Sequence, residues 1–412
     1  MDNLTHSLVG LVAGELIART LRPTTAGLSD STRRVALISI GVLGGNLPDS
    51  DLAWSMGAVT GDTLAYLLEH RGYTHTLPGC GVLAAGLFAA TLGVLRWRGQ
   101  RESAAERGLL AAMALLAVLL HVVMDSLNSY GVHPFWPWNN RWFYGDAVFI
   151  IEPLYWLATA PLLLALYTLR ARLLLGLALL VGSVALLIVH GFGLLWWTLP
   201  LGTAALVWCS RHWSARRAVL TSAALMLTVT GLFIAAGLQA TARIDAIAAR
   251  QFPEFETLDR VLSPLPVQPL CWDVLLVQRS AEFYVVRRGQ LALVGPVAAA
   301  SCPRLFGSAA NTAPLQARDA GPDPALAWRD EYSLPLATLR RLAQQDCRAG
   351  ELLQFARAPF AVETAAGWVL GDLRFDREPG LGMAELLLRA DGTDDCRYHV
   401  PWLPPRADLL TP

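Results

Sequence analysis

Histidines and aspartates stand at three places in the first third of the sequence, in spacings that suit metal ligands. The side chains are Asp49, Asp51, His70, His75, His121 and Asp125, and His6 near the start of the chain is a seventh candidate. Zinc and manganese take imidazole nitrogen and carboxylate oxygen as ligands, and a catalytic site leaves one position open for water. The sequence therefore predicts one shared metal centre of one or two divalent ions, with zinc favoured and manganese as the alternative.

The spacing within each pair sets the local structure that the pair needs. His121 and Asp125 are four residues apart, so they share one face of a predicted helix near its end. His70 and His75 are five residues apart, about 140° around an ideal helix, and they converge only where the chain turns, as Gly72 permits. The two aspartates follow a proline, which disfavours helix before it and places them in a loop. They could bridge two metals or serve two metals separately.

Three residues are candidates for catalytic roles. Arg71 could stabilise an anionic transition state, or it could pair with Asp49 or Asp51. Asp51 is also a candidate catalytic residue, and Asn128 or Tyr130 could support the ligands from the edge of the site. Taken singly, each motif has a structural alternative: a His-x-x-x-Asp pair can belong to a helix interior, an Asp-x-Asp pair can form a solvated turn, and a histidine can anchor a helix at the membrane surface. The combination favours a site, because ionisable groups at the ends of spanning segments are costly unless they have partners.

The composition indicates a membrane protein. Of 412 residues, 54% are hydrophobic and 16% are charged, whereas soluble domains carry about 25% charged residues. The long apolar runs end before residue 241, so the sequence predicts a membrane domain over residues 1–240 and a soluble domain over residues 241–412. The formal net charge is zero, which gives no support for a nucleic-acid partner.

The apolar runs predict an α-helical, multi-pass membrane domain of about eight helices, most of them near the roughly 20 residues that cross hydrocarbon. The predicted helices are Leu4–Ala18, Val35–Leu47, Leu77–Leu95, Leu109–Leu127, Ala147–Leu169, Leu173–Val189, Gly193–Cys209 and Val219–Leu238. The first two are short, so we expect them to be tilted or partly re-entrant. We expect no cleavable signal peptide, because the first three residues do not form a basic segment.

Arginines are concentrated in alternate connections between these helices, around residues 19–34, 96–107, 170–172 and 211–217. An excess of Lys and Arg marks cytoplasmic loops. The other connections, which hold the candidate ligands, are therefore predicted on the extracytoplasmic side together with the C-terminal domain. Cys271, Cys302, Cys347 and Cys396 lie in that domain, where an oxidising compartment would permit two disulfides in any of three pairings; four reduced thiols are the alternative.

The C-terminal domain is predicted to be a mixed α/β, β-rich soluble domain. Short alternating segments at residues 274–277, 282–286, 367–370 and 385–388 are typical of strands, and residues 336–345 are typical of a helix. The domain carries no catalytic motif of its own. We therefore expect it to cover the site or to select substrate, with a purely scaffolding role as the alternative.

Together, these residues resemble the LexA-binding, inner-membrane-associated family of metal-dependent hydrolases over residues 1 to about 170. The shared motifs are Thr5-His6, Asn46-Leu47-Pro48-Asp49 with Asp51, the His-Arg-Gly-x-Thr-His box at residues 70–75, and His121 with Asp125 followed by Asn128, Tyr130 and Gly131. The resemblance implies a multi-pass protein of the bacterial inner membrane with a hydrolase site distantly similar in its ligands to zinc-dependent phospholipase C. LexA binding is not carried over, because the site is predicted to face outward whereas a repressor is cytoplasmic.

The sequence thus predicts a membrane-embedded hydrolase that acts on a phosphoester, or another ester bond, of a lipid or lipid-linked amphiphilic substrate at the outer face. The bilayer and that substrate are the expected partners. A metal-binding transporter is the main alternative, but it would place charged residues deep within several helices, where Glu15 is the main example. A structural membrane anchor is a further alternative, and it would need no convergent set of ligands.

Overall fold

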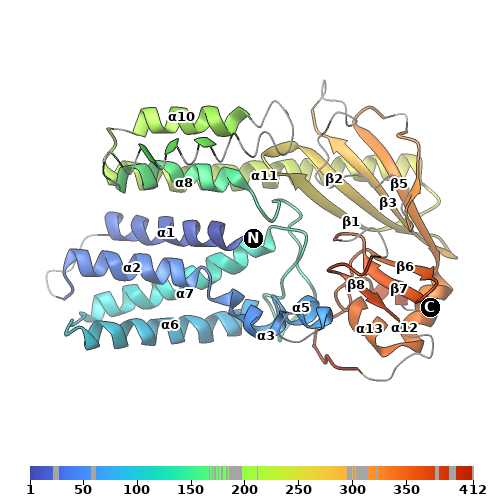
Figure 1. The fold of residues 1–412 in the computed structure, drawn as a ribbon, viewed down its shortest axis with the longest axis horizontal. Helices are drawn as coiled ribbons and strands as arrows, with labels where there is room; N and C mark the ends of the chain where they lie inside the picture. The colour runs from blue at the N-terminus through green and yellow to red at the C-terminus, as the bar shows by residue number, and fades with distance from the viewer. Residues whose placement is uncertain are drawn as a thin grey trace.

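The computed structural model has a helical N-terminal half followed by a sheet-rich C-terminal domain (Figure 1). It describes residues 1–21, 27–56, 62–166, 168, 170, 173–174, 176–177, 180–181, 184, 197–210, 212–294, 299, 302, 314–321, 323–375, 380–388 and 396–410. The predicted order of a helical region and a β-rich domain is confirmed.

The longer helices of the N-terminal half run side by side (Figure 1). They are α1 (Asn3–Thr20), α2 (Asp30–Gly44), α6 (Leu77–Trp97), α7 (Ala104–Ser126), α8 (Pro153–Leu166), α10 (Thr198–Ser210) and α11 (Ala215–Gln251). Shorter turns of helix lie between α2 and α6, namely η1 (Pro48–Asp51), α3 (Leu52–Ser55), α5 (Thr63–Glu69) and η2 (Tyr73–His75). α1 and α2 approach each other so closely that a Cβ atom on Gly10 would collide with the carbonyl group of Gly41. Glycine at this crossing therefore allows the two backbones to pack directly.

Three of the described helices, α6, α7 and α11, are long and apolar enough to cross a membrane. The prediction of about eight membrane helices is not supported by the part of the chain that the structure describes. α8 and α10 have 14 and 13 residues, and at a rise of about 1.5 Å per residue they fall short of a hydrocarbon core of roughly 30 Å. The predicted helix at residues 173–189 lies largely outside the described residues.

Polar caps set where the helices begin. Ser103 and Glu106 form a capping box at the start of α7, and the Glu106 carboxylate also accepts the backbone N–H of Leu28 at 3.0 Å. The hydroxyl of Thr76 accepts the backbone N–H of Gly79 at 3.0 Å and so caps α6. Because α6 begins directly after Thr76, the preceding 70–75 loop is fixed at the end of a helix that is long and apolar enough to cross a membrane.

The C-terminal domain contains two antiparallel sheets, a five-stranded sheet in the order β1-β2-β3-β5-β4 and a three-stranded sheet in the order β6-β7-β8. The strands are β1 (Glu256–Leu265), β2 (Gln268–Arg279), β3 (Phe283–Ala292), β4 (Gln316–Ala317), β5 (Leu326–Pro335), β6 (Pro359–Thr364), β7 (Gly367–Asp372) and β8 (Glu385–Leu387). Its helices are α12 (Leu336–Gln345), α13 (Cys347–Leu353) and α14 (Ala407–Leu410). The predicted strands fall on β2, β3, β7 and β8, and the predicted helix coincides with α12.

Both faces of the five-stranded sheet are covered. Val274 and Leu276 of β2 pack against Ile244 on the last turns of α11, whereas Leu275 and Val277 point into a second core. This alternation follows from the two-residue period of a strand. α11 runs unbroken to Gln251, so the boundary predicted between residues 240 and 241 falls within this helix.

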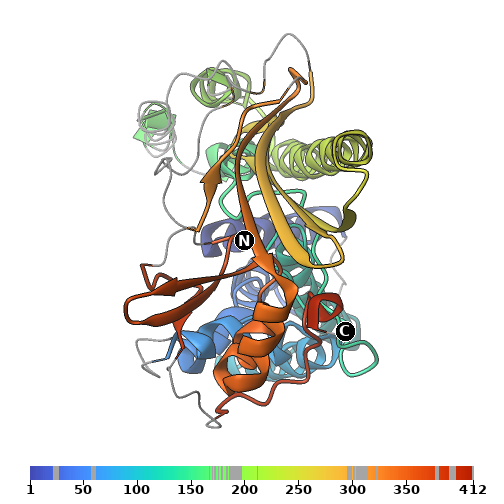
Figure 2. The same ribbon diagram turned by 90° about the vertical axis from the view of Figure 1, so that its right-hand side faces the viewer.

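The C-terminal domain lies across one end of the helices (Figures 1 and 2). α3, α5 and the first residues of α1 are at this end, whereas the end of α1, the start of α2, the connection from α6 to α7 and the start of α11 are at the opposite end (Figure 1). The predicted ligands and the C-terminal domain therefore share one end of the helices, and arginines such as Arg19, Arg98 and Arg216 lie at the other.

Two disulfides connect segments of the C-terminal domain. Cys271 pairs with Cys302 and Cys347 pairs with Cys396, with Cα atoms 5.8 and 5.4 Å apart. The structure thus selects one of the three pairings that the sequence left open.

Candidate metal centre

Four of the predicted ligands converge at the end of the helices that adjoins the C-terminal domain. Asp49 lies in η1, His75 in η2, and His121 and Asp125 near the end of α7. Their ligand atoms all lie within 4.8 Å of one another. The Nε2 atoms of His75 and His121 are 3.1 Å apart. Each nitrogen lies 3.3 to 3.5 Å from Oδ1 of Asp49 and from Oδ2 of Asp125.

The hydrogen bonds of the two imidazoles direct lone pairs at one point. His121 Nδ1 lies 2.7 Å from the carbonyl oxygen of Gly45, which can only accept, so Nδ1 carries the proton and Nε2 presents a lone pair. His75 Nδ1 lies 3.0 Å from Thr74 Oγ1, and that hydroxyl donates to Asp51 Oδ2 at 2.8 Å. Because the Thr74 hydroxyl donates its proton to Asp51, it accepts from His75, so His75 Nδ1 carries a proton and His75 Nε2 presents the second lone pair. Two lone pairs cannot bond to each other, whereas both can bind a cation.

The spacing of the four ligand atoms fits a small cation. In a tetrahedral site with ligand bonds of about 2.0–2.2 Å, the ligand atoms are about 3.3–3.6 Å apart. The nitrogen–nitrogen and nitrogen–oxygen distances of this group range from 3.1 to 3.5 Å. The side chains present are therefore arranged as the ligands of a zinc-sized ion would be.

Asp51 holds the 70–75 loop in place. Its carboxylate accepts hydrogen bonds from His70 Nδ1 at 2.9 Å, from the backbone N–H of Arg71 at 2.9 Å and from Thr74 Oγ1 at 2.8 Å. Arg71 adopts a φ of 60°, a left-handed conformation that is unfavourable for a residue with a side chain. The bond from Asp51 to the Arg71 backbone stabilises this turn. Asp51 also belongs to a second possible ligand group, with Asp49 and His70.

Gly72 contributes to the turn through close packing. The sequence assigned the turn to its conformational freedom, but the left-handed residue is Arg71. A Cβ atom on Gly72 would lie 2.7 Å from the carbonyl oxygen of Glu69 and 3.3 Å from the indole ring of Trp402. Gly72 is therefore needed so that the loop can lie against its neighbours.

His6 contacts the centre from one side. Its ring stacks on His121 with centroids 3.8 Å apart, and its Nε2 lies 3.2 Å from Asp125 Oδ1. The Met1 amino group contacts the same oxygen. Because the other oxygen of Asp125 faces the histidine pair, His6 is placed as a partner of Asp125 and is not one of the four converging ligands.

Arg71 pairs with Asp125. Its Nε lies 3.0 Å from Asp125 Oδ2, and its Nη1 donates to Asn128 Oδ1 at 3.0 Å. The sequence offered Asp49 or Asp51 as carboxylate partners for the side chain, and the structure shows Asp125 in that place. The guanidinium is buried beside the Tyr130 ring, with its carbon 4.7 Å from the ring centroid. Asn128 thus fixes the orientation of Arg71.

The protonation states of residues 49, 51 and 70 suit cation binding. Burial alone would raise the pKa of Asp49, but hydrogen bonds and charges from His121 and His75 hold that pKa well below its usual range. Burial would likewise raise the pKa of Asp51, and His70 and His75 hold it low. Burial lowers the pKa of His70, although Asp51 opposes the change. At neutral pH the two aspartates are therefore ionised and His70 is neutral.

Several residues around the centre were not predicted from the sequence. Tyr66 stacks on His70 with ring centroids 4.9 Å apart. His133 is buried between Trp142 and Trp402, with centroid distances of 3.8 and 3.9 Å. Trp402 comes from a proline-flanked segment near the end of the C-terminal domain. The contact of Trp402 with the 70–75 loop joins segments that are far apart in the sequence, so no local sequence pattern predicts it.

Asp146 and Glu152, two acidic residues that precede α8, lie away from the centre. Asp146 pairs with Arg357 of the C-terminal domain, with oxygen–nitrogen distances of 2.8 and 2.7 Å. Glu152 accepts the backbone N–H of Val267 at the tip of the β1–β2 hairpin. Both acids therefore attach the C-terminal domain to the helical half.

A cavity of about 190 Å³ lies between the centre and the C-terminal domain. Tyr66, Asn128 and Tyr130 line it from the helical half, and Leu275 and Met383 line it from the C-terminal domain. Because Asn128 bonds Arg71 and Tyr66 stacks on His70, the cavity adjoins the residues that surround the converging ligands.

Comparison with known proteins supports a membrane location. Residues 1–198, which include all the candidate ligands, match the family model of the YdjM inner membrane protein. The uncharacterized protein YfhP of Bacillus subtilis (strain 168) is 29% identical over 142 residues, which amount to 34% of this chain and 39% of that protein. The similarity thus spans well under half of that relative's length. No solved structure matches the chain.

Proposed function

We propose that the protein is a membrane-embedded, metal-dependent hydrolase of the kind that its sequence motifs resemble. It would cleave a phosphoester, or another ester bond, in a lipid or lipid-linked substrate at the outer face of the membrane. Asp49, His75, His121 and Asp125 would hold one divalent cation, zinc before manganese. Asp49, Asp51 and His70 offer a position for a second.

The observation that carries this proposal is the convergence of four lone-pair donors in a buried place. The charge balance supports the same conclusion. The two ligand groups contain three carboxylates, those of Asp49, Asp51 and Asp125. The two cationic groups beside them, the guanidinium of Arg71 and the amino group of Met1, both contact Asp125. Unbalanced buried charge is costly. A divalent cation would compensate the excess of negative charge.

The proposed chemistry divides between the cation and the chain. A divalent ion held at this centre would polarise an ester oxygen and lower the pKa of a water molecule toward about 7. Arg71, oriented by Asn128, offers a guanidinium that can stabilise negative charge on a phosphoryl oxygen. His70 is neutral, and its Nδ1 is fixed on Asp51, so its Nε2 is available to exchange a proton at the edge of the centre.

The position of the centre supports an amphiphilic substrate. The adjoining cavity has mainly apolar walls, including Leu265, Leu275 and Phe375. Ile150 and Met383 on its wall are 38% and 46% exposed, so apolar surface continues outward from it. Its volume of about 190 Å³ is below the roughly 300–1,000 Å³ of sites for drug-sized ligands. The cavity therefore suits one apolar segment of a larger molecule.

The proposal includes a multi-pass topology with the C-terminal domain outside the cytoplasm. The two disulfides of that domain are chemically suited to an oxidising compartment. Arginines such as Arg19, Arg98 and Arg216 lie at the other end of the helices, as expected for a cytoplasmic face (Figure 1). The centre would then face outward beneath the C-terminal domain.

Metal analysis and hydrolysis assays on the same samples test the proposal. The full-length protein is purified in detergent, loaded with zinc or manganese, and compared with His75→Ala and His121→Ala. We expect near-stoichiometric metal and turnover of phosphoesters, including short-chain phospholipids, and loss of both in each variant. His212→Ala, which changes an exposed histidine at the far end of the helices, is the matched control and should retain both properties.

Each negative result has a separate meaning. Folded protein that binds no metal after loading would contradict the metal centre. Stoichiometric metal without hydrolysis of phosphoesters or carboxylic esters would contradict the hydrolase and favour the transporter alternative.

A further inference from the structure

The arginine-rich end of the helices contains a cationic cavity that the proposed hydrolase does not use. The cavity has a volume of about 480 Å³ and lies where α1 ends and where α2 and α11 begin. Arg19, Arg33, Arg34 and Arg216 line it, and Asp30 is the carboxylate on its wall. This end of the described structure therefore presents several guanidinium groups to one open cavity.

Two of these arginines have a carboxylate partner outside the cavity wall. Glu15 is fully buried, and it pairs with Arg19 Nε at 2.7 Å and with the guanidinium of Arg34. The charge of Glu15, the buried carboxylate of α1, is therefore balanced by the guanidinium groups of Arg19 and Arg34. Arg33 and Arg216 are left without an ion pair among the described residues.

Arg33 is buried in an unusual way for a cation. Arg33 is only 5% exposed. Its Nη2 lies 3.5 Å from the carbonyl oxygen of Ala18 and 3.4 Å from that of Leu21. These distances exceed the usual range of about 2.7–3.2 Å. Its Nε has no hydrogen-bond partner in the described structure. The sequence of residues 22–26 and 167–196 contains no Asp or Glu that could supply a carboxylate.

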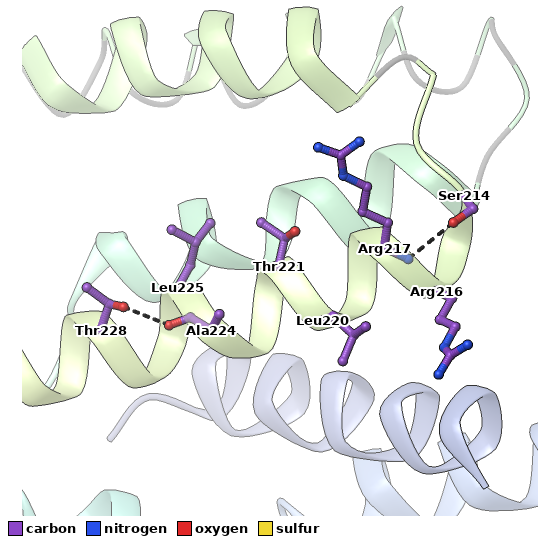
Figure 3. Close-up of a pocket in the computed structure, with 8 residues that line it drawn as sticks. All are labelled: Ser214, Arg216, Arg217, Leu220, Thr221, Ala224, Leu225 and Thr228. Atoms are coloured by element: carbon purple, nitrogen blue, oxygen red, sulfur yellow. Dashed lines mark hydrogen bonds between the residues drawn. The ribbon is translucent and has the colours of Figure 1, made fainter.

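Arg216 connects this cavity to an apolar groove. The groove has a volume of about 580 Å³ and follows the first turns of α11. Leu220, Ala224 and Leu225 supply its apolar wall, and its other lining residues are Ser214, Arg216, Arg217, Thr221 and Thr228. Figure 3 shows Arg216 and Leu220 on the same side of α11, with Arg217 pointing to another side. Arg216 itself is exposed. A cation therefore stands where an apolar channel along a membrane helix meets a cationic cavity.

We propose that an anionic phospholipid binds at this place, with its phosphate between Arg33 and Arg216 and one acyl chain along α11. Guanidinium groups match phosphate oxygens in geometry and charge, and basic pockets between membrane helices bind anionic headgroups. A phosphate would give Arg33 the charged partner that the described chain does not provide. A free phosphate ion would satisfy the arginines but not the groove beside Leu220, so the groove favours the lipid.

Lipid titration of the full chain tests this site without reference to hydrolysis. The protein is delipidated in detergent and titrated with phosphatidylglycerol, with phosphatidylcholine and, separately, with inorganic phosphate; native mass spectrometry counts the bound molecules. We expect one retained phosphatidylglycerol. Arg216→Gln should weaken its binding about fivefold, and the double variant with Arg33→Gln about 25-fold or more.

The controls separate this site from general attraction to positive charge. Arg101→Gln removes an exposed arginine from the connection between α6 and α7 at the same end and should leave binding unchanged. Arg216 is exposed, so its single variant is expected to fold even where the double variant does not. Three results would each overturn the proposal. They are binding of phosphatidylcholine equal to that of phosphatidylglycerol, binding of inorganic phosphate equal to that of phosphatidylglycerol, and unchanged phosphatidylglycerol binding in Arg216→Gln.

Discussion

Replacing Glu152 by glutamine should stabilise the protein above neutral pH and change its stability little at acidic pH. Glu152 precedes α8 and is fully buried. Its carboxylate accepts the backbone N–H groups of Leu154 and Val267, each at 3.0 Å. Val267 lies at the tip of the β1–β2 hairpin and packs against Leu199 of α10. Burial raises the pKa of Glu152 to about 7, and the two N–H groups oppose this rise only in part.

The raised pKa of Glu152 determines whether the carboxylic acid gains or loses stability for the fold as pH rises. The pKa in the folded protein, about 7, exceeds the ordinary value of 4.5. The folded state therefore holds a proton on Glu152 that the unfolded chain has already released, and stability from this group falls as pH rises from 4.5 to 7. The difference corresponds to about 3 kcal/mol. A glutamine keeps a neutral carbonyl acceptor at this position at every pH, so it avoids that loss.

Chemical denaturation in detergent at matched pH values measures the effect. The difference in free energy of unfolding between Glu152→Gln and the parent should grow from pH 4 to pH 8 by about 3 kcal/mol in favour of the variant. The comparison cancels the contribution of other groups, such as His133, whose pKa is lowered to about 3 by burial. Glu363→Gln, on the exposed side of β6, is the matched control. A difference that stays constant with pH, or that favours the parent at pH 8, would refute the reasoning.

Three further outcomes are expected. Asp51→Asn should lower metal affinity about 10- to 100-fold, measured by competition with a chromophoric chelator, because it disrupts the bonds that hold the 70–75 loop; unchanged affinity would remove its positioning role. Arg357→Met should cost about 3–5 kcal/mol in denaturation, because it removes the buried guanidinium that pairs with Asp146 and Asp259, whereas the exposed Arg341→Met should stay within about 0.5 kcal/mol. The double variant of Cys347→Ser and Cys396→Ser opens a loop of 49 residues and should cost up to about 4 kcal/mol in the same assay.

The sequence predicted the elements whose apolar pattern is local. The strands at β2, β3, β7 and β8 and the helix α12 follow from periods of two and 3.6 residues, which depend only on neighbouring side chains. The end of α11 could not be predicted in this way. Mean hydropathy falls after Thr241 because Arg243, Asp245 and Arg250 appear. The helix nevertheless continues, since Ile244 keeps an apolar face toward the sheet.

Four of the seven predicted ligands converge at one point, and the sequence did not predict how the roles of the seven divide. Helix spacing places His121 with Asp125, and the shared end of the helices brings the other ligands near them. Asp49 and Asp51 differ only by their positions in η1, a single turn that no spacing rule resolves. Asp49 faces the histidine pair, whereas Asp51 bonds the backbone of a left-handed Arg71. That turn depends on contacts from distant segments.

The two ends of the helices show that charge at a membrane boundary can be structural as well as topological. Arginines that only mark a cytoplasmic connection have no need to be buried. Arg33 is 5% exposed and Glu15 is fully enclosed, so the fold has removed both from water. At the other end, Asp51, Asp125 and Arg71 are removed from water in the same way. Each buried charge needs a partner, and the two proposed ligands would supply the partners that the described chain lacks: a cation beneath the C-terminal domain and an anion beside Arg33.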